Sequence, residues 1–141
     1  MGRMLIEAVM QADDCVLSGA LDRTGSPLLG SDASAFLGTN CGVAVTADLR
    51  AGLSDSDVLI DFTRPEGTLA HLAVCRELGV KLVIGTTGFS AAQKAEIGAQ
   101  ARHVGVMMAP NMSIGVNVVL GLLDKAARAL AEGYDVEIIE A

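Results

Sequence analysis

Short apolar runs alternate with longer helical segments through most of this 141-residue chain. The strongest runs are residues 57–62, 82–84 and 104–108, and their length and composition are typical of buried strands. One helical segment opens at 63–66 and runs to 78, and another runs from 90 to 102. Because strands joined by helical crossovers lie parallel, this pattern predicts an α/β fold with a doubly wound parallel sheet.

The rest of the chain continues the alternation but begins with a helix. We expect helices at 4–10, 48–53 and 115–131, strands at 15–21, 43–45 and 136–139, and an irregular excursion at 28–42. A doubly wound domain normally begins with a strand that is followed by a glycine-rich turn. The sequence therefore predicts that the sheet lacks its first strand in this chain, and that this strand lies before Met1.

Local signals mark where the helices begin and end. Pro65 stands at a first helical position, where proline is tolerated, and Thr63 is a candidate cap for the same helix. Gly79 is a natural terminator. Ser90 and Gln93 have the spacing of a capping box, which predicts a helix start at residue 90.

Composition excludes several classes of protein. Apolar residues make up 51% of the chain and charged residues 19%, which gives ample core material and argues against disorder. The net charge is −7 and there is no basic run, so we expect no nucleic-acid partner. No stretch approaches the about 20 apolar residues of a membrane helix. There is no signal-peptide pattern, so we expect a cytoplasmic protein without a membrane partner.

Few residues have the spacing that catalysis or metal binding requires. Cys15, Cys41 and Cys75 are widely spaced, so we expect buried thiols in a reducing compartment and neither a disulfide framework nor a zinc site. His71 and His103 have no nearby Cys or Asp at metal or triad spacing, and we interpret both as structural. No carboxylates pair for acid–base work. The sequence therefore predicts binding loops, with no catalytic and no metal residues.

The first candidate binding loop follows the expected strand at 15–21. In parallel sheets ligands bind at the carboxyl ends of the strands, and an acid after the second strand bonds the adenosine ribose. Asp22 is a candidate for that role, and Arg23 for pairing with a 2′-phosphate. The alternative is a solvated turn. The pair suits NADH or NADPH equally.

Three more loops follow predicted strands. At 61–65, Phe62 is a candidate to line the cofactor crevice. At 85–88, Gly85 allows close approach to a ligand, and Thr86 and Thr87 are candidates for the nicotinamide ribose or carboxamide. At 109–113, Asn111 either bonds the carboxamide or fixes the loop, while Met112 packs on apolar surface.

Five ordered motifs together resemble the 4-hydroxy-tetrahydrodipicolinate reductase family of lysine biosynthesis. They are Met1-Gly2-Arg3-Met4, residues 61–67, 85–89 and 111–117, and residues 136–141. Their order spans the whole chain. The resemblance implies a Rossmann-like cofactor domain, reduction of a cyclic dicarboxylate by NADH or NADPH, and a homotetramer.

The resemblance also implies roles for particular residues. Met1 matches the last residue of the glycine-rich phosphate loop, and Asp22 matches the acidic residue at the adenosine ribose, where the family often has Glu. Arg23 matches the residue near the 2′-phosphate. The nicotinamide-side loop is matched by Gly85, Thr86 and Thr87, and the second cofactor loop by Ala109, Pro110, Asn111 and Met112.

Two parts of the family pattern are missing from the sequence. The first strand and the body of the glycine-rich loop would precede Met1, and a His-rich catalytic stretch with a Lys and a Pro-Ser-Gly-Thr segment would follow Ala141. We therefore expect residues 1–141 to be one truncated dinucleotide-binding domain, inactive without a substrate domain. The alternatives are a non-catalytic NAD(P)-binding module and the cofactor half of another nicotinamide dehydrogenase.

Overall fold

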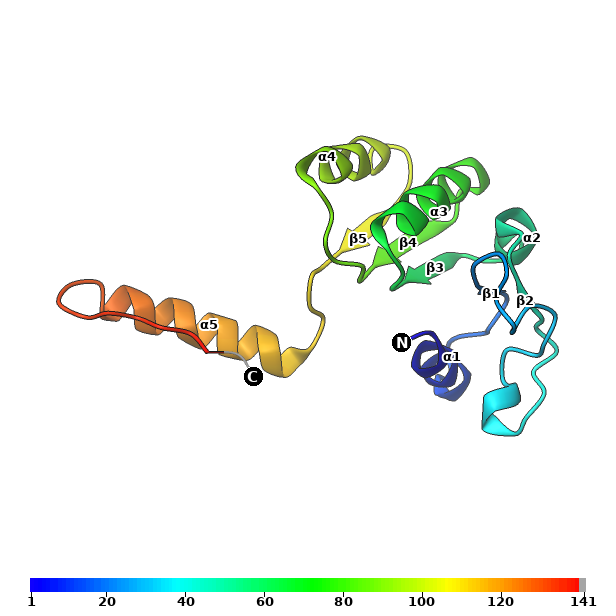
Figure 1. Ribbon diagram of the computed structural model, residues 1–141, viewed down its shortest axis with the longest axis horizontal. Helices are drawn as coiled ribbons and strands as arrows, with labels where there is room; N and C mark the ends of the chain where they lie inside the picture. Colours follow the sequence, from blue (N-terminus) through cyan, green and yellow to red (C-terminus); the bar gives the residue numbers. More distant parts are fainter. Residues whose placement is uncertain (140–141) are drawn as a thin grey trace. The chain divides into compact units, whose positions relative to one another are not determined.

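The computed structural model describes residues 1–139 and divides the chain into two compact units, Met1–Met108 and Ala109–Ala141 (Figure 1). The first unit holds ten of the secondary-structure elements and the second holds one. In chain order the elements are α1 (Gly2–Gln11), β1 (Ala20–Leu21), the 3₁₀ turn η1 (Ala35–Leu37), β2 (Val45–Thr46), α2 (Leu49–Leu53), β3 (Val58–Asp61), α3 (Pro65–Leu78), β4 (Lys81–Ile84), α4 (Ala91–Gln100), β5 (Val106–Met108) and α5 (Ile114–Ala129).

All strand pairs of the first unit are parallel, which confirms the predicted α/β class. Strands β3, β4 and β5 form one sheet in that order, and Asp61, Ile84 and Met108 are in register at its carboxyl edge. Strands β1 and β2 form a separate two-stranded sheet. The doubly wound sheet predicted from the sequence is thus present as two parallel parts in the described residues.

One face of the β3–β4–β5 sheet is covered by α3 and α4 (Figure 1). Leu72 and Cys75 of α3 and Ile97 of α4 pack against Leu82 and Ile84 of β4, and all five are almost fully buried. Apolar burial of this kind contributes about 25 cal/mol per Å² removed from water. This packing fixes the carboxyl edge of the sheet relative to the start of α3.

The predicted helix boundaries are largely confirmed. Pro65 is the first residue of α3, and Gly79 ends this helix with a φ of 76°, a left-handed conformation that glycine adopts at little cost. The capping box of α4 is present, with Ser90 and Gln93 each bonding the other's backbone. Thr63, however, does not cap α3. The cap position is Arg64, and the Thr63 hydroxyl donates to Asp61 at 2.6 Å.

Strand β1 is shorter than predicted. The apolar run at 15–21 pairs with β2 only through Ala20 and Leu21. A strand extends as far as a neighbour supplies hydrogen bonds, and β2 itself has two residues. Gly19 lies so close to the Gly52 carbonyl of α2 that a β-carbon would overlap it. The approach of these two segments therefore requires glycine.

The excursion between β1 and β2 is organised by the carboxylate of Asp32. Its Oδ1 accepts hydrogen bonds from the Ser34 hydroxyl at 2.6 Å and from the Ser34 backbone at 2.8 Å, and its Oδ2 accepts one from the Gly42 backbone at 2.8 Å. These bonds, the hydroxyl of Ser34 first, lower the pKa of Asp32 below its ordinary value. The segment is thus ordered although it has little regular structure.

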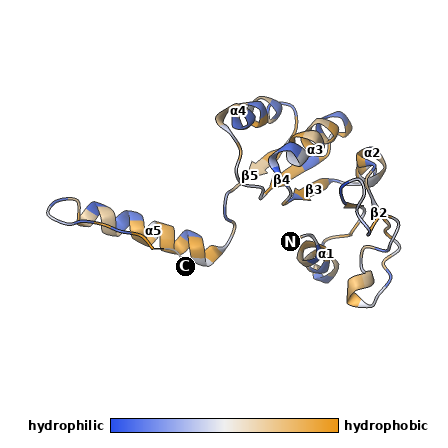
Figure 2. Cartoon of the chain, in the orientation of Figure 1, coloured by the Kyte–Doolittle hydropathy of each residue, from blue (hydrophilic) through white to orange (hydrophobic). Residues whose placement is uncertain are grey.

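The second unit is built on α5, whose first turn is capped by the Ser113 hydroxyl. Figure 2 shows apolar residues along this helix, and Val118, Val119 and Leu122 are more than half exposed. The predicted strand at 136–139 is wrong, because these residues have no regular secondary structure and no paired strand. A run of strand-like composition forms a strand only where a neighbour completes its hydrogen bonds. Within residues 1–139 no helix is long and apolar enough to cross a membrane.

Candidate functional site

A cavity of about 600 Å³ lies in the first unit, where α1, β1, β3 and the start of α3 face one another. Its walls include Met1 and Gly2 at the start of α1, Asp22 after β1, Ile60 of β3, Thr63 between β3 and α3, and His71 of α3. Both β1 and β3 line it, and neither is paired with a strand on that side. The cavity therefore separates the two parallel sheets.

The start of α1 forms one end of the cavity. Met1 is the cap residue of this helix and offers no side-chain bond to it, so the first backbone N–H groups of the helix are not satisfied by a cap. Free N–H groups and the positive end of the helix dipole attract anions such as phosphate. Met1, one of the predicted site residues, thus lies at a position suited to a diphosphate.

Asp22, which follows β1, also lines the cavity. Its Oδ1 accepts from the Arg23 backbone at 2.7 Å, and its Oδ2 accepts from the Ser26 hydroxyl at 2.6 Å. A carboxylate has about four acceptor positions, so two remain for ribose hydroxyls. Arg23 is exposed beside the cavity, and its side chain makes no hydrogen bond or ion pair within residues 1–139.

The loop at 85–88 follows β4 and does not line the cavity. Gly85 lies against the ring of Phe62, and a β-carbon at this position would overlap the ring, so the close approach requires glycine. The side chain of Thr86 is buried, whereas Thr87 is exposed. Of the two threonines that the sequence singled out, only Thr87 presents its side chain to solvent.

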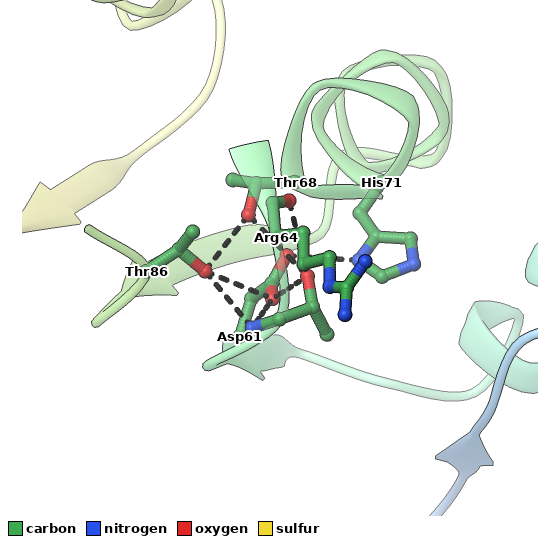
Figure 3. A network of polar contacts seen from close by, with 6 residues as sticks. Asp61, Arg64, Thr68, His71 and Thr86 are labelled. Atoms are coloured by element: carbon green, nitrogen blue, oxygen red, sulfur yellow. Dashed lines mark hydrogen bonds and ion pairs between the residues drawn. The ribbon is translucent and has the colours of Figure 1, made fainter. Parts of the chain in front are cut away.

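A polar network occupies the carboxyl ends of β3 and β4 (Figure 3). The Asp61 Oδ1 accepts from the Thr63 hydroxyl at 2.6 Å and from its backbone at 2.9 Å, and the Oδ2 lies 2.8 Å from the His71 Nδ1. The Thr86 hydroxyl accepts from the Thr63 backbone and from the Thr68 hydroxyl, both at 2.9 Å. One carboxylate thereby links two strand ends to α3.

Asp61 is ionised in this environment. Burial raises the pKa of its carboxyl group, but the hydrogen bonds from His71 and Thr63 outweigh burial, and the pKa falls below its ordinary value. Because a carboxylate only accepts, the Nδ1 of His71 carries the proton of their shared hydrogen bond. Burial and the nearby charge of Asp61 raise the pKa of Cys75 to about 11, so this thiol is unreactive at neutral pH.

The pairing of Asp61 with His71 was not predicted from the sequence, because the two residues are ten positions apart and do not have the spacing of a metal site or a triad. A usable signal was present, because Thr68, His71 and Cys75 recur at helical spacing on one face of α3. Polar residues on an inward helical face, beside a strand that ends in Asp, indicate a buried polar network.

The remaining predicted residues lie in the second unit, in the segment before α5. Asn111 is exposed, and its side-chain oxygen accepts from the Ser113 backbone at 2.8 Å. The side chain of Asn117 donates to the Asn111 carbonyl at 3.1 Å. The amide of Asn111 therefore fixes the loop, which is one of the two roles expected for it. Ala109, Pro110 and Met112 make no side-chain hydrogen bond there, and Met112 is 37% exposed.

These features fit a dinucleotide. An uncapped helix start suits a diphosphate and a half-buried carboxylate suits a ribose, and both line the same cavity. Within residues 1–139 no group of three or more His, Cys, Asp or Glu side chains is arranged to hold a metal ion. The chemistry that the site supports best is the binding of a nucleotide cofactor.

Comparison with protein families gives a match that agrees with this geometry. Residues 1–112 match the family model described as "Dihydrodipicolinate reductase, N-terminus". The match includes α1, Asp22, the Asp61 network and the loop at 85–88. It ends at Met112, within the segment before α5.

Individual relatives are similar along the whole chain. The 4-hydroxy-tetrahydrodipicolinate reductase of Cupriavidus taiwanensis is 59% identical over 141 residues, and that of Burkholderia ambifaria is 61% identical over the same length. Each alignment covers 100% of this chain and 53% of the relative. The chain therefore spans about half the length of the curated relatives it matches.

A solved structure shows the same fold. The dipicolinate-bound dihydrodipicolinate reductase from Paenisporosarcina sp. TG-14 is 28% identical, with a TM-score of 0.68. The superposition covers 86% of this chain and 47% of the other. The α/β arrangement described above is thus of the Rossmann type.

Proposed function

Because the chain belongs to the dihydrodipicolinate reductase family, we propose that it is the cofactor-binding part of an NADH- or NADPH-dependent reductase of lysine (diaminopimelate) biosynthesis. The observation that carries this proposal is the cavity shared by the start of α1 and Asp22. Its lining offers a helix start for a diphosphate and a carboxylate for a ribose, which are the recognition elements of a dinucleotide.

The adenosine half is assigned to the cavity. The diphosphate lies at the first backbone N–H groups of α1, beside Met1, and the adenosine ribose bonds Asp22. The exposed guanidinium of Arg23 stands next to Asp22 and is free to pair with a 2′-phosphate. Both NADH and NADPH are therefore accommodated, with Arg23 supporting the phosphorylated form.

The nicotinamide half is assigned to two loops. Gly85, Thr86 and Thr87 follow β4, and a loop at the carboxyl end of a parallel strand is where ligands bind. Because the Thr86 hydroxyl is used within the network, we assign its backbone and the exposed Thr87 side chain to the nicotinamide. The segment Ala109–Met112 supplies the second loop.

The complete enzyme reduces a cyclic dicarboxylate. Support comes from the names of the relatives and from the dipicolinate bound in the Paenisporosarcina enzyme. The nicotinamide supplies the hydride when bound, and the residues of this chain position it. Substrate recognition and proton transfer belong to a second domain, within the additional length of the relatives. We further propose a homotetramer in the cytoplasm.

We also propose that a further parallel strand of the complete enzyme pairs with the free edges of β1 and β3, and that the dinucleotide lies beyond the carboxyl end of this strand, in the part of the cavity beside Met1 and Asp22. Strands β1 and β3 each present an unpaired edge to the cavity, and the backbone N–H and C=O groups of an edge are satisfied best by another strand. Val58 and Ile60 of β3 are 44% and 39% exposed, which leaves apolar surface for such a strand to cover. This strand would join the two parallel sheets into one.

A reductase assay of the full-length enzyme tests the proposed activity. Oxidation of NADH or NADPH is followed at 340 nm with 4-hydroxy-tetrahydrodipicolinate as the substrate. We expect turnover that requires this substrate and either cofactor. If neither cofactor is oxidised in the presence of the substrate, the proposed activity is wrong.

A further inference from the structure

The Asp61 network joins the segment after β3 to the loop at 85–88, which the proposed function assigns to the nicotinamide. We propose that Asp61, Thr68 and His71 are positioning residues for the nicotinamide, which act by fixing the loop at 85–88 through the hydroxyl of Thr86. This inference rests on the proposed function and extends it to side chains that act on the nicotinamide through Thr86.

The first step is the attachment of the loop. Within residues 1–139, the hydroxyl of Thr86 makes the loop's only side-chain hydrogen bonds to other segments. It receives one from the Thr63 backbone after β3 and one from Thr68 on α3, both at 2.9 Å. Thr87 and Gly88 are exposed and have no such bond. The position of the loop therefore depends on Thr86.

The second step is the anchor beneath Thr86. The side chain of Asp61 is 1% exposed and that of His71 is 14% exposed. Removing a carboxylate from water is costly, and the hydrogen bonds from His71 and from Thr63 offset that cost. A carboxylate satisfied on both oxygens holds its partners at fixed angles, so the ends of β3 and β4 cannot shift independently.

The third step is the direction of the backbone. The Gly85 N–H donates to the Asp61 carbonyl at 2.8 Å, and Gly85 lies against the ring of Phe62. Backbone and side chain of Asp61 thus hold the first half of the loop from two sides. Because β3 and β4 pair up to Asp61 and Ile84, the network begins where the sheet's own hydrogen bonds end. It extends the rigidity of the sheet into the proposed binding loop.

If the network positions the nicotinamide loop, its loss should weaken NADH and ADP-ribose binding to different extents. If the network only stabilises the fold, both ligands should be affected equally. A loop held by Thr86 affects the nicotinamide, whereas the diphosphate and adenosine ribose are assigned to the cavity at α1 and Asp22. Asp61, Thr63 and His71 also line that cavity, but Thr68 and Thr86 do not. ADP-ribose contains the diphosphate and the adenosine ribose and lacks nicotinamide. For variants of Thr68, the ratio of NADH affinity to ADP-ribose affinity therefore reports on the loop.

The test uses the full-length enzyme with Thr68→Val and Thr68→Ser. Valine has the shape of threonine but cannot donate to Thr86, whereas serine keeps the hydroxyl. We expect Thr68→Val to weaken NADH binding about fivefold, as the loss of one hydrogen bond predicts, and to change ADP-ribose binding by less than about twofold. Thr68→Ser restores NADH binding to within about twofold of wild type.

Ser34→Ala is the matched control. Its hydroxyl is fully buried and donates to Asp32, as Thr68 donates within the network, but it lies in the excursion away from the site. We expect no change in either ligand for this variant. If Thr68→Val does not fold, Asp61→Asn is tested in its place. We expect Asp61→Asn also to weaken NADH binding more than ADP-ribose binding.

Three results overturn the inference. The first is that Thr68→Val loses the same affinity for NADH and for ADP-ribose. The second is that NADH binding is unchanged in both Thr68→Val and Asp61→Asn, and the third is that Thr68→Ser does not restore NADH binding. If the variants give one of these results but the wild-type enzyme binds both ADP-ribose and NADH, the inference is wrong and the proposed function still holds. Wild-type enzyme that binds neither ligand contradicts both.

Discussion

At the scale of single residues, Asp61 combines full burial with a negative charge. The folded chain lowers the pKa of its carboxyl group, so the ionised form is bound more tightly in the folded than in the unfolded state. The stabilisation is therefore complete above the ordinary pKa of 3.8 and is lost as the pH falls through the lower folded value. Asp61 is thus an acid-sensitive part of the fold.

Substitution of Asp61 by asparagine tests this assignment. Asparagine keeps the size but removes the charge, and we expect a loss of about 1–3 kcal/mol in the free energy of unfolding at pH 7. Urea denaturation of the full-length enzyme at several pH values between 7 and 2 measures it. The difference from wild type should shrink below pH 3.8. A difference that is the same at all pH values would contradict the account.

We propose that Arg23 favours NADPH and that Asp22 favours NADH. Arg23→Ala should weaken NADPH binding about tenfold or more and largely spare NADH, because a charged hydrogen bond to the 2′-phosphate is lost. Fluorescence titration with both cofactors measures this. Arg102→Ala, which removes an exposed arginine from the turn after α4, is the control. Equal losses for NADH and NADPH would exclude the assigned role.

Asp22 is expected to show the opposite preference. Its two remaining acceptor positions suit the two free hydroxyls of the NADH ribose, whereas NADPH has one of them phosphorylated. Asp22→Ala should therefore weaken NADH more than NADPH in the same titration. Asp13→Ala, an exposed carboxylate after α1, is the matched control. A larger loss for NADPH would count against the ribose assignment.

At the scale of elements, α4 begins with a complete capping box. Ser90→Ala removes the side-chain acceptor for the Gln93 backbone, and such a loss typically costs about 1 kcal/mol. Urea denaturation of the full-length enzyme should show that decrease, while Ser90→Thr, which keeps the hydroxyl, should lie close to wild type. If the alanine variant is as stable as wild type, the cap contributes nothing to the fold.

Elements with strong local signals could be predicted from the sequence, and elements that depend on a partner could not. The ends of α3 and α4 follow from Pro65, Gly79 and the Ser90–Gln93 pair, since each acts within a few residues. The extents of β1 and of the run at 136–139 depend on neighbouring strands. The strands that were predicted from composition alone are therefore shorter in the structure, as for β1, or absent, as at 136–139.

At the scale of the whole molecule, the same distinction applies to the candidate site. Strand alternation predicted that loops after strands would bear function, and it gave Asp22 and the loop at 85–88 as candidates. It could not show that Met1 and Asp22 line one cavity, since this requires the placement of α1 against β1 and β3. Nor could it show that Asp61 and His71 meet, because helix α3 must first pack on the sheet.

The first unit is a Rossmann-type cofactor domain, and we propose that its two parallel sheets border a dinucleotide site. A crystal structure of the full-length enzyme with NADPH tests this claim most directly. We predict the diphosphate at the first N–H groups of α1 and the adenosine ribose within hydrogen-bonding distance of Asp22. A dinucleotide bound away from both α1 and Asp22 would contradict the account.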